Sequence, residues 1–176
     1  RKRRDFSYLC RMNRELEQYI ERTVIPRYEG FDRAHGTEHV RTVIARSLAL
    51  ARHYDVSTEM VYAVAAYHDT GLAFGRERHH TDAGRILFED RELRRWFPEE
   101  HLRVMREAVE DHRASSDHAP RSIYGRIVAE ADRCIKPLTI LRRTIQYGLA
   151  HYPQLDRQGH YDRFAEHLRK KYADGG

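Results

Sequence analysis

Apolar residues recur every three to four positions through most of the chain, whereas runs that alternate between apolar and polar residues are almost absent. The first pattern is typical of helices that bury one face, and the scarcity of the second argues against strands. The sequence therefore predicts an all-α fold. Helices are expected at residues 7–25, 36–54, 58–71, 80–89, 99–112, 122–134, 138–151 and 160–173.

Two stretches between these helices are expected to be loops. Residues 72–79 contain Gly75, and residues 113–121 contain neighbouring serines and Pro120. Glycine, serine and proline favour turns over continued helix. Both loops are candidates for the rim of a functional site.

The length of the chain favours one domain. Its 176 residues are enough for one sizeable hydrophobic core, and no low-complexity stretch separates a second one. We expect a single domain over residues 1–176, with its motif-bearing region at about 35–135 and further helices at 136–176.

Charge and cysteine content restrict the expected partners and location. The 32 basic residues are balanced by 27 acidic ones along the chain, so the net charge of +5 does not by itself indicate a nucleic-acid partner. No apolar run is long enough to span a bilayer. Cys10 and Cys134 form no CxxC pair, which favours a reducing compartment, and we expect a cytoplasmic protein. The sequence leaves the oligomeric state open.

The pair His68-Asp69 places two polar side chains inside the apolar run 61–71. Burying an imidazole and a carboxylate is costly unless they find partners, and metal coordination is a common solution for these residue types. The pair therefore indicates a metal site. The alternative is that Asp69 caps the next segment and His68 is a hydrogen-bonded core histidine.

Four further residues extend this pattern. His39 opens an amphipathic helix and Asp132 ends an apolar one, so both side chains can turn toward the core. His80 and His112 lie on the helices between them, and neither is convincing alone.

His39, the His68-Asp69 pair and Asp132 resemble, in order and rough spacing, the signature of the HD superfamily of metal-dependent phosphohydrolases. That signature is a His, then a His-Asp pair, then a distant Asp, all on helices. The resemblance covers about residues 35–135 and implies a compact helical bundle with a metal site in its core. It also implies that His80 and His112 are the two extra ligands of dinuclear members. One ion would then be held by His39, His68 and Asp132 and the other by His80 and His112, with Asp69 bridging both.

His79 is the main alternative to His80 as a ligand. We favour His80 because the Thr81-Asp82-Ala83-Gly84 that follows it resembles the family pattern, in which a ligand histidine precedes a small residue one turn later.

The resemblance implies a phosphohydrolase that acts on a small phosphorylated substrate, with a nucleotide as one candidate and a metal-bridging hydroxide as nucleophile. His68 and Asp69 would then be catalytic as well as metal-binding. An imidazole-rich set suits one or two divalent ions of iron, manganese, cobalt or zinc.

Candidate substrate-binding residues lie next to these ligands. Arg76 and Arg78, in the glycine-containing loop, could clamp a phosphate, although solvated loop arginines are equally expected. His35, four residues before His39, could contact substrate or only start the helix.

Two other function classes compete with the hydrolase. The six-ligand set also resembles HD-type di-iron oxygenases, which cleave a C–C or C–P bond, and the ligands alone cannot separate the two reactions. A binding or sensor module with a structural metal is the third hypothesis. It fits less well, because three or four protein ligands per metal leave positions open for chemistry.

Overall fold

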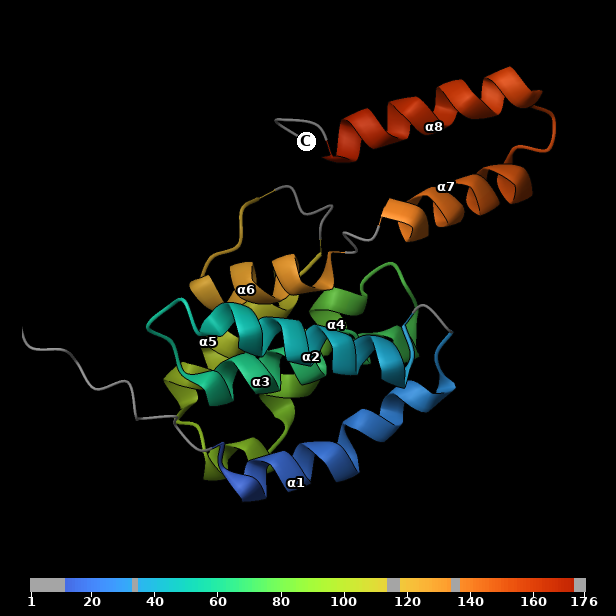
Figure 1. Ribbon diagram of the computed structural model, residues 1–176. Coiled ribbons are helices and arrows are strands. Elements are labelled where there is room, and N and C mark those ends of the chain that lie inside the picture. Colours follow the sequence, from blue (N-terminus) through green and yellow to red (C-terminus); the bar gives the residue numbers. More distant parts are fainter. Residues whose placement is uncertain (1–11, 33–34, 114–117, 134–136, 173–176) are drawn as a thin grey trace, which may run out of the picture. The chain divides into compact units, whose positions relative to one another are not determined.

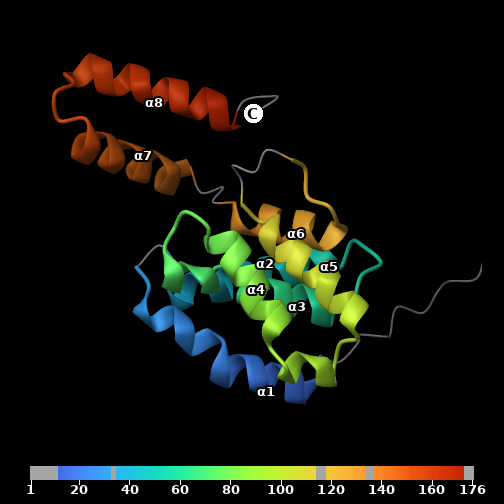
Figure 2. The same ribbon diagram turned by 180° about the vertical axis from the view of Figure 1, so that it is seen from behind.

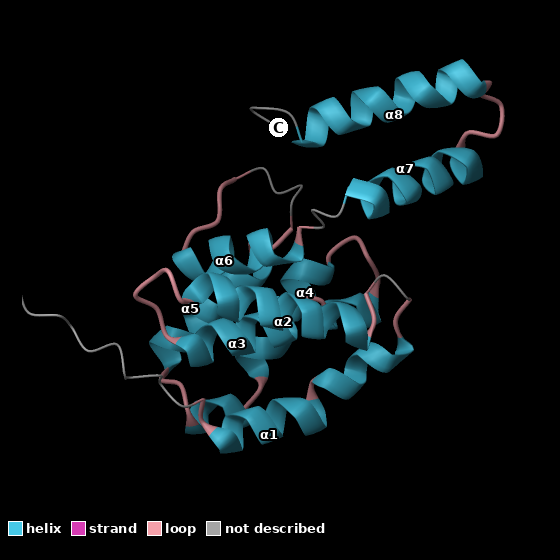
Figure 3. Ribbon diagram, in the orientation of Figure 1, coloured by secondary structure: helices cyan, strands magenta, loops and turns pink. Residues whose placement is uncertain are grey.

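The computed structural model describes residues 12–32, 35–113, 118–133 and 137–172 (Figure 1). The chain divides into two compact units, Arg1–Arg133 and Cys134–Gly176. Helices and the turns and loops between them account for all the described residues (Figure 3), which confirms the predicted all-α class. None of the described helices is long and apolar enough to cross a membrane. The expectation that residues 1–176 form a single domain stays a prediction.

The first unit consists of six α-helices and three 3-10 helices, labelled η, within its described residues. Their bounds are α1 Arg14–Thr23, η1 Ile25–Gly30, α2 Thr37–Ala51, α3 Thr58–Tyr67, η2 Thr70–Phe74, α4 His79–Glu89, η3 Glu92–Arg95, α5 Glu99–Glu110 and α6 Ile123–Asp132.

Helix α3 is the central element of this unit. Every residue from Met60 to Tyr67 is buried, and α3 contacts α2, α4, α5 and α6. Its first turn is fixed by the side chain of Ser57, which accepts a hydrogen bond from the Met60 N–H at 3.3 Å. Seen from behind, α4 and α5 lie side by side over it (Figure 2). The fold therefore carries the end of α3 into the interior of the unit.

The predicted helix 58–71 is two segments in the structure. Helix α3 ends at Tyr67, Asp69 leaves helical geometry with φ −106° and ψ 4°, and η2 begins at Thr70. A β-carbon at Gly71 would lie only 2.6 Å from the backbone nitrogen of Ala83, so η2 packs directly on the backbone of α4. This break places His68 and Asp69 at a turn rather than along a helix.

The other helix ends differ from the prediction by a few residues. Helix α1 begins after Asn13, whose side chain accepts hydrogen bonds from the first turn, and η1 follows with Pro26 at its start. The helices η1 and η3 were not predicted, and α8 starts at Arg157 rather than 160. Residues 7–11, 114–117, 134 and 173 of the predicted elements lie outside the described residues.

The second unit contains α7 (Pro137–His151) and α8 (Arg157–Tyr172). Thr144 and Gly148 of α7 are buried, and the Arg163 guanidinium of α8 lies against Gly148. Arg163 Nη2 donates to the Thr144 carbonyl at 2.6 Å. A glycine in α7 thus leaves room for an arginine that joins the two helices.

Candidate metal centre

His68 and Asp69 are buried at the end of α3. The exposed fraction is 0% for His68 and 4% for Asp69. His68 Nδ1 lies 2.8 Å from the Ala65 carbonyl oxygen, which can only accept, so Nδ1 carries the proton. In the neutral imidazole this leaves the Nε2 lone pair free for a metal.

Two other histidines are oriented in the same way. His112 Nδ1 donates to the Val109 carbonyl at 2.6 Å, and His79 Nδ1 donates to the Arg76 carbonyl at 2.7 Å. A hydrogen bond from the second ring nitrogen is the arrangement that metal-binding histidines usually show. These three imidazoles are therefore held with Nε2 as the available donor atom.

The carboxylate of Asp69 lies between two pairs of imidazoles. Its Oδ2 is 3.2 Å from His68 Nε2 and 3.5 Å from His39 Nε2. Its Oδ1 is 3.5 Å from His112 Nε2 and 3.6 Å from His79 Nε2. Each oxygen thus completes a separate group of three donor atoms that could hold a metal ion.

Asp132, the last residue of α6, adds a second carboxylate on the His39 side. Its Oδ1 lies 3.2 Å from His39 Nε2 and 4.0 Å from His68 Nε2. Arg46 Nη1 donates to the carbonyls of Ala131 and Arg133, each at 3.3 Å, and thereby fixes this end of α6. The fold brings together five of the six predicted ligands: His39, His68, Asp69, His112 and Asp132.

The sixth position is occupied by His79 instead of His80. Both residues lie in the first turn of α4, where neighbouring side chains point about 100° apart. His79 faces Asp69 and His112, whereas His80 belongs to neither donor group and its buried Nδ1 has no hydrogen-bond partner among the described residues. The structure therefore places His79, and not His80, beside Asp69, and the choice of the sixth ligand stays a prediction.

The imidazoles of the cluster keep the carboxylate of Asp69 ionised. Burial opposes the charge of Asp69, but the nearby imidazoles of His68, His112 and His39 outweigh it and hold the pKa of Asp69 well below its usual range. Burial also opposes protonation of His39, but hydrogen bonds to Asp132 and Asp69 raise its pKa to about 9. Burial lowers the pKa of His79, which favours its neutral form. The carboxylates are thus charged and ready to balance metal ions.

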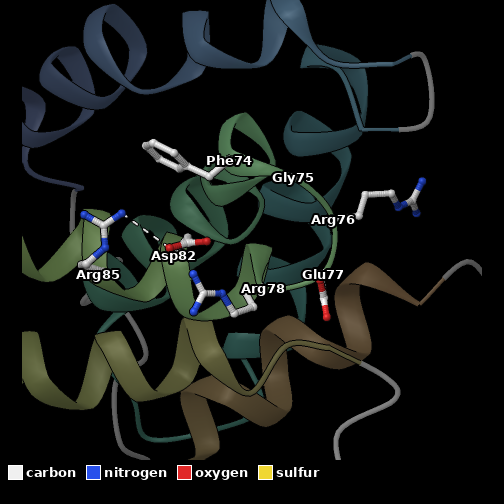
Figure 4. Close-up of a pocket in the computed structure, with 7 residues that line it drawn as sticks. All are labelled: Phe74, Gly75, Arg76, Glu77, Arg78, Asp82 and Arg85. Carbon is white, nitrogen blue, oxygen red and sulfur yellow. Dashed lines mark hydrogen bonds and ion pairs between the residues drawn. The ribbon is translucent and has the colours of Figure 1, made fainter.

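The predicted substrate-binding residues lie around the centre. The His35 ring is 5.9 Å from the His39 ring, and His35 Nδ1 is 2.9 Å from Asp32 Oδ1. The Arg76 side chain is largely exposed and lies 4.0 Å from Asp32. Arg76 and Arg78 line a cavity of about 560 Å³ (Figure 4). The other lining residues are Phe74, Gly75, Glu77, Asp82 and Arg85.

One residue that sequence reasoning missed is Tyr28 of η1. It is fully buried, and its hydroxyl oxygen accepts a hydrogen bond from the Asp69 N–H at 3.2 Å. No local pattern identifies it, because Tyr28 and Asp69 are 41 positions apart in the sequence and nothing around Tyr28 resembles a site.

The fold and cluster define a class of all-helical proteins with a buried His/Asp site in the core. The HD domain family model matches residues 36–136, and the chain belongs to this family. The crystal structure of a predicted HD superfamily hydrolase from an uncultured Thermotogales bacterium is similar, with a TM-score of 0.59 and 19% identity. The match covers 96% of this chain and 97% of that one, and at this identity it shows the fold alone. The comparison with curated proteins gave no match.

Proposed function

We propose that this HD-domain protein is a metal-dependent phosphohydrolase that acts on a small phosphate ester, with a nucleotide as one candidate substrate. The observation that carries the proposal is the carboxylate of Asp69, whose two oxygens face two different pairs of imidazole nitrogens. A carboxylate with one oxygen toward each nitrogen-rich group could hold two metal ions close together, as a two-metal hydrolytic site needs.

The donor atoms fit such a centre. We assign His39, His68 and Asp132 to one ion and His79 and His112 to the other, with Asp69 shared between them. Four imidazoles and two carboxylates suit divalent iron, manganese, cobalt or zinc. When bound, two such ions supply a water of lowered pKa as nucleophile and stabilise the charge that develops on a phosphoryl group.

Hydrogen bonds within the protein fix the orientation of the candidate metal ligands. The Nδ1 hydrogen bonds of His68 and His112 hold both rings in one orientation, and the burial of these rings keeps bulk water from that side of the centre. Asp69 holds both halves of the centre together. We therefore assign catalytic roles to His68 and Asp69.

Arg78 is the best placed of the candidate substrate-binding residues. It directly precedes His79, and its guanidinium has no hydrogen bond or ion pair with other described residues. Arg76 points away from Arg78 and Arg85 in Figure 4. We propose that Arg78 contacts a substrate phosphate, and that Arg76 and His35 contribute at the edge of the site.

A matched pair of variants tests the metal centre. His79→Ala and His80→Ala make the same change on adjacent residues in the first turn of α4. Protein purified without oxygen would be assayed for bound metal and, with manganese added, for phosphate release from phosphomonoesters and phosphodiesters. The unaltered protein should hold close to two ions per chain. His79→Ala should lose one ion and lower activity by about 100-fold or more, while His80→Ala should retain both.

Three results would contradict the proposal. They are the absence of bound metal in the unaltered protein, equal losses in the two variants, and two bound irons with oxygen consumption but no phosphate release. The third result would favour the HD-type oxygenase instead.

A further inference from the structure

Side chains donate hydrogen bonds to the last carbonyl groups of α3. The last four carbonyl groups of any α-helix have no partner within that helix, and here these groups are buried. Three successive carbonyls accept a hydrogen bond from a side chain at 2.8 Å each. They are Ala65 with His68, Ala66 with Tyr28, and Tyr67 with Thr70. Of the three donors, only Tyr28 belongs to a distant part of the chain.

The Tyr28 hydroxyl group makes two hydrogen bonds that span His68. Its O–H donates to the Ala66 carbonyl at 2.8 Å, and its oxygen accepts from the Asp69 N–H at 3.2 Å. The donor and the acceptor are therefore both used, and the side chain is fully buried. One oxygen atom thus joins the last turn of α3 to the backbone that follows it.

This bridge acts where the chain leaves helical geometry. His68 still has helical angles, whereas Asp69 does not. The angles at this turn decide the relative directions of the two side chains, which approach to 3.2 Å between His68 Nε2 and Asp69 Oδ2. A small rotation at Asp69 would move its carboxylate away from the imidazoles, and metal affinity is sensitive to such displacements.

We propose that Tyr28 is a positioning residue that fixes the backbone between His68 and Asp69 and thereby sets the affinity of the centre for metal. The inference rests on the proposed function and deepens it, because it assigns control of the bridging carboxylate to a residue outside the ligand set.

Tyr28→Phe tests this role by removing one atom. The ring stays against Phe31 and His68, at centroid distances of 5.4 and 6.3 Å, while the Ala66 carbonyl and the Asp69 N–H lose their partner. We expect Co²⁺ affinity, measured by absorption titration, to fall about tenfold or more. The Asp69 amide hydrogen in the metal-free protein should exchange about tenfold faster or more, because its acceptor is gone.

The matched control is Tyr19→Phe. This variant also removes a tyrosine hydroxyl group, which donates a hydrogen bond to Asp90 Oδ2 at 2.6 Å. Asp90 lies outside the two groups of candidate metal ligands. This variant should keep the Co²⁺ affinity and the Asp69 exchange rate of the unaltered protein. A purely structural role for Tyr28 would lower the melting temperature but leave Co²⁺ affinity within twofold, and that result would overturn the proposal.

Two further outcomes keep the test decisive. If the unaltered protein binds no Co²⁺, the proposed function fails, while Asp69 amide exchange still decides the role of Tyr28 in the backbone. If Tyr28→Phe does not fold, the unaltered protein is measured instead. Slow exchange of the Asp69 amide then supports the bridge, and exchange at the rate of an exposed amide overturns it.

Discussion

Replacing Gly71 with alanine is expected to remove the ion that we assign to His79 and His112 and to spare the other. The added β-carbon would lie 2.6 Å from the backbone nitrogen of Ala83 and 2.9 Å from the carbonyl carbon of His79. Both atoms belong to the backbone of α4, so no side chain can rotate away. The carbonyl oxygen of His79 would lie closer still. Since carbon normally contacts such atoms at about 3.5 Å, η2 and α4 must separate by at least about 0.9 Å, the difference between 3.5 and 2.6 Å.

This separation is large compared with the tolerance of a metal site. Metal–ligand distances vary by only about 0.2 Å, and His79 moves with α4 whereas Asp69 precedes η2. His39 and Asp132 lie on α2 and α6, His68 directly follows α3, and all three should keep their positions. The overpacking itself should lower the free energy of unfolding by about 3 kcal/mol. For a unit of this size, that corresponds to a melting temperature lower by about 10 °C.

The assay compares Gly71→Ala with Gly30→Ala by metal content and thermal unfolding. A β-carbon at Gly30 would meet nothing within 4 Å, so this control makes the same chemical change in open space. Gly71→Ala should retain about one ion per chain, and Gly30→Ala should retain two with an almost unchanged melting temperature. The reasoning is refuted if Gly71→Ala keeps both ions and melts within about 1 °C of the unaltered protein.

Two further predictions concern protons and a buried ion pair. Because the pKa of His39 is raised to about 9, metal must displace a proton from it at neutral pH, so affinity should rise about tenfold per pH unit until pH 9. The buffer takes up the released proton, and Tris and PIPES differ in their heat of protonation. Equal calorimetric heats of metal binding in the two buffers would therefore contradict this. Arg121→Ala should lower the free energy of unfolding by about 2 kcal/mol, because it leaves the buried Asp111 without the guanidinium at 2.8 Å. Urea unfolding would measure this against the exposed Arg126→Ala, and equal stabilities would contradict it.

Helical periodicity was sufficient to predict the fold class but not the break after Tyr67. Residues 61–71 form an almost continuous apolar run, so nothing in their spacing marks an end to the helix. The break depends on tertiary contacts, namely the Tyr28 hydroxyl bridge and the packing of Gly71 on α4. Contacts between residues so distant in sequence are not visible in a local pattern.

The candidate site was predictable where polar residues interrupt apolar ones. His68 and Asp69 are conspicuous inside their apolar run, and the order of His39 and Asp132 around them gave the family resemblance. The choice between His79 and His80 could not be predicted from such a pattern, because it depends on which side of one helix each residue faces. The predicted helix began at residue 80, whereas α4 begins at His79. Each residue turns a helix by about 100°, so an uncertainty of one position exchanges the inward and outward side chains.

The candidate ligands share one feature, which is that each lies at an end of a helix. His39 and His79 lie in the first turns of α2 and α4, His68 and His112 follow α3 and α5, and Asp132 ends α6. Ala65 and Val109 lie in the last turns of α3 and α5, where a carbonyl has no regular helical partner four residues later. The Val109 carbonyl also accepts the His112 backbone N–H at 3.4 Å. Each of these two carbonyls accepts the Nδ1 proton of the histidine three residues later, which directs the Nε2 lone pair toward Asp69. The side-chain hydrogen bonds at these two helix ends thus also fix the orientation of two candidate ligands.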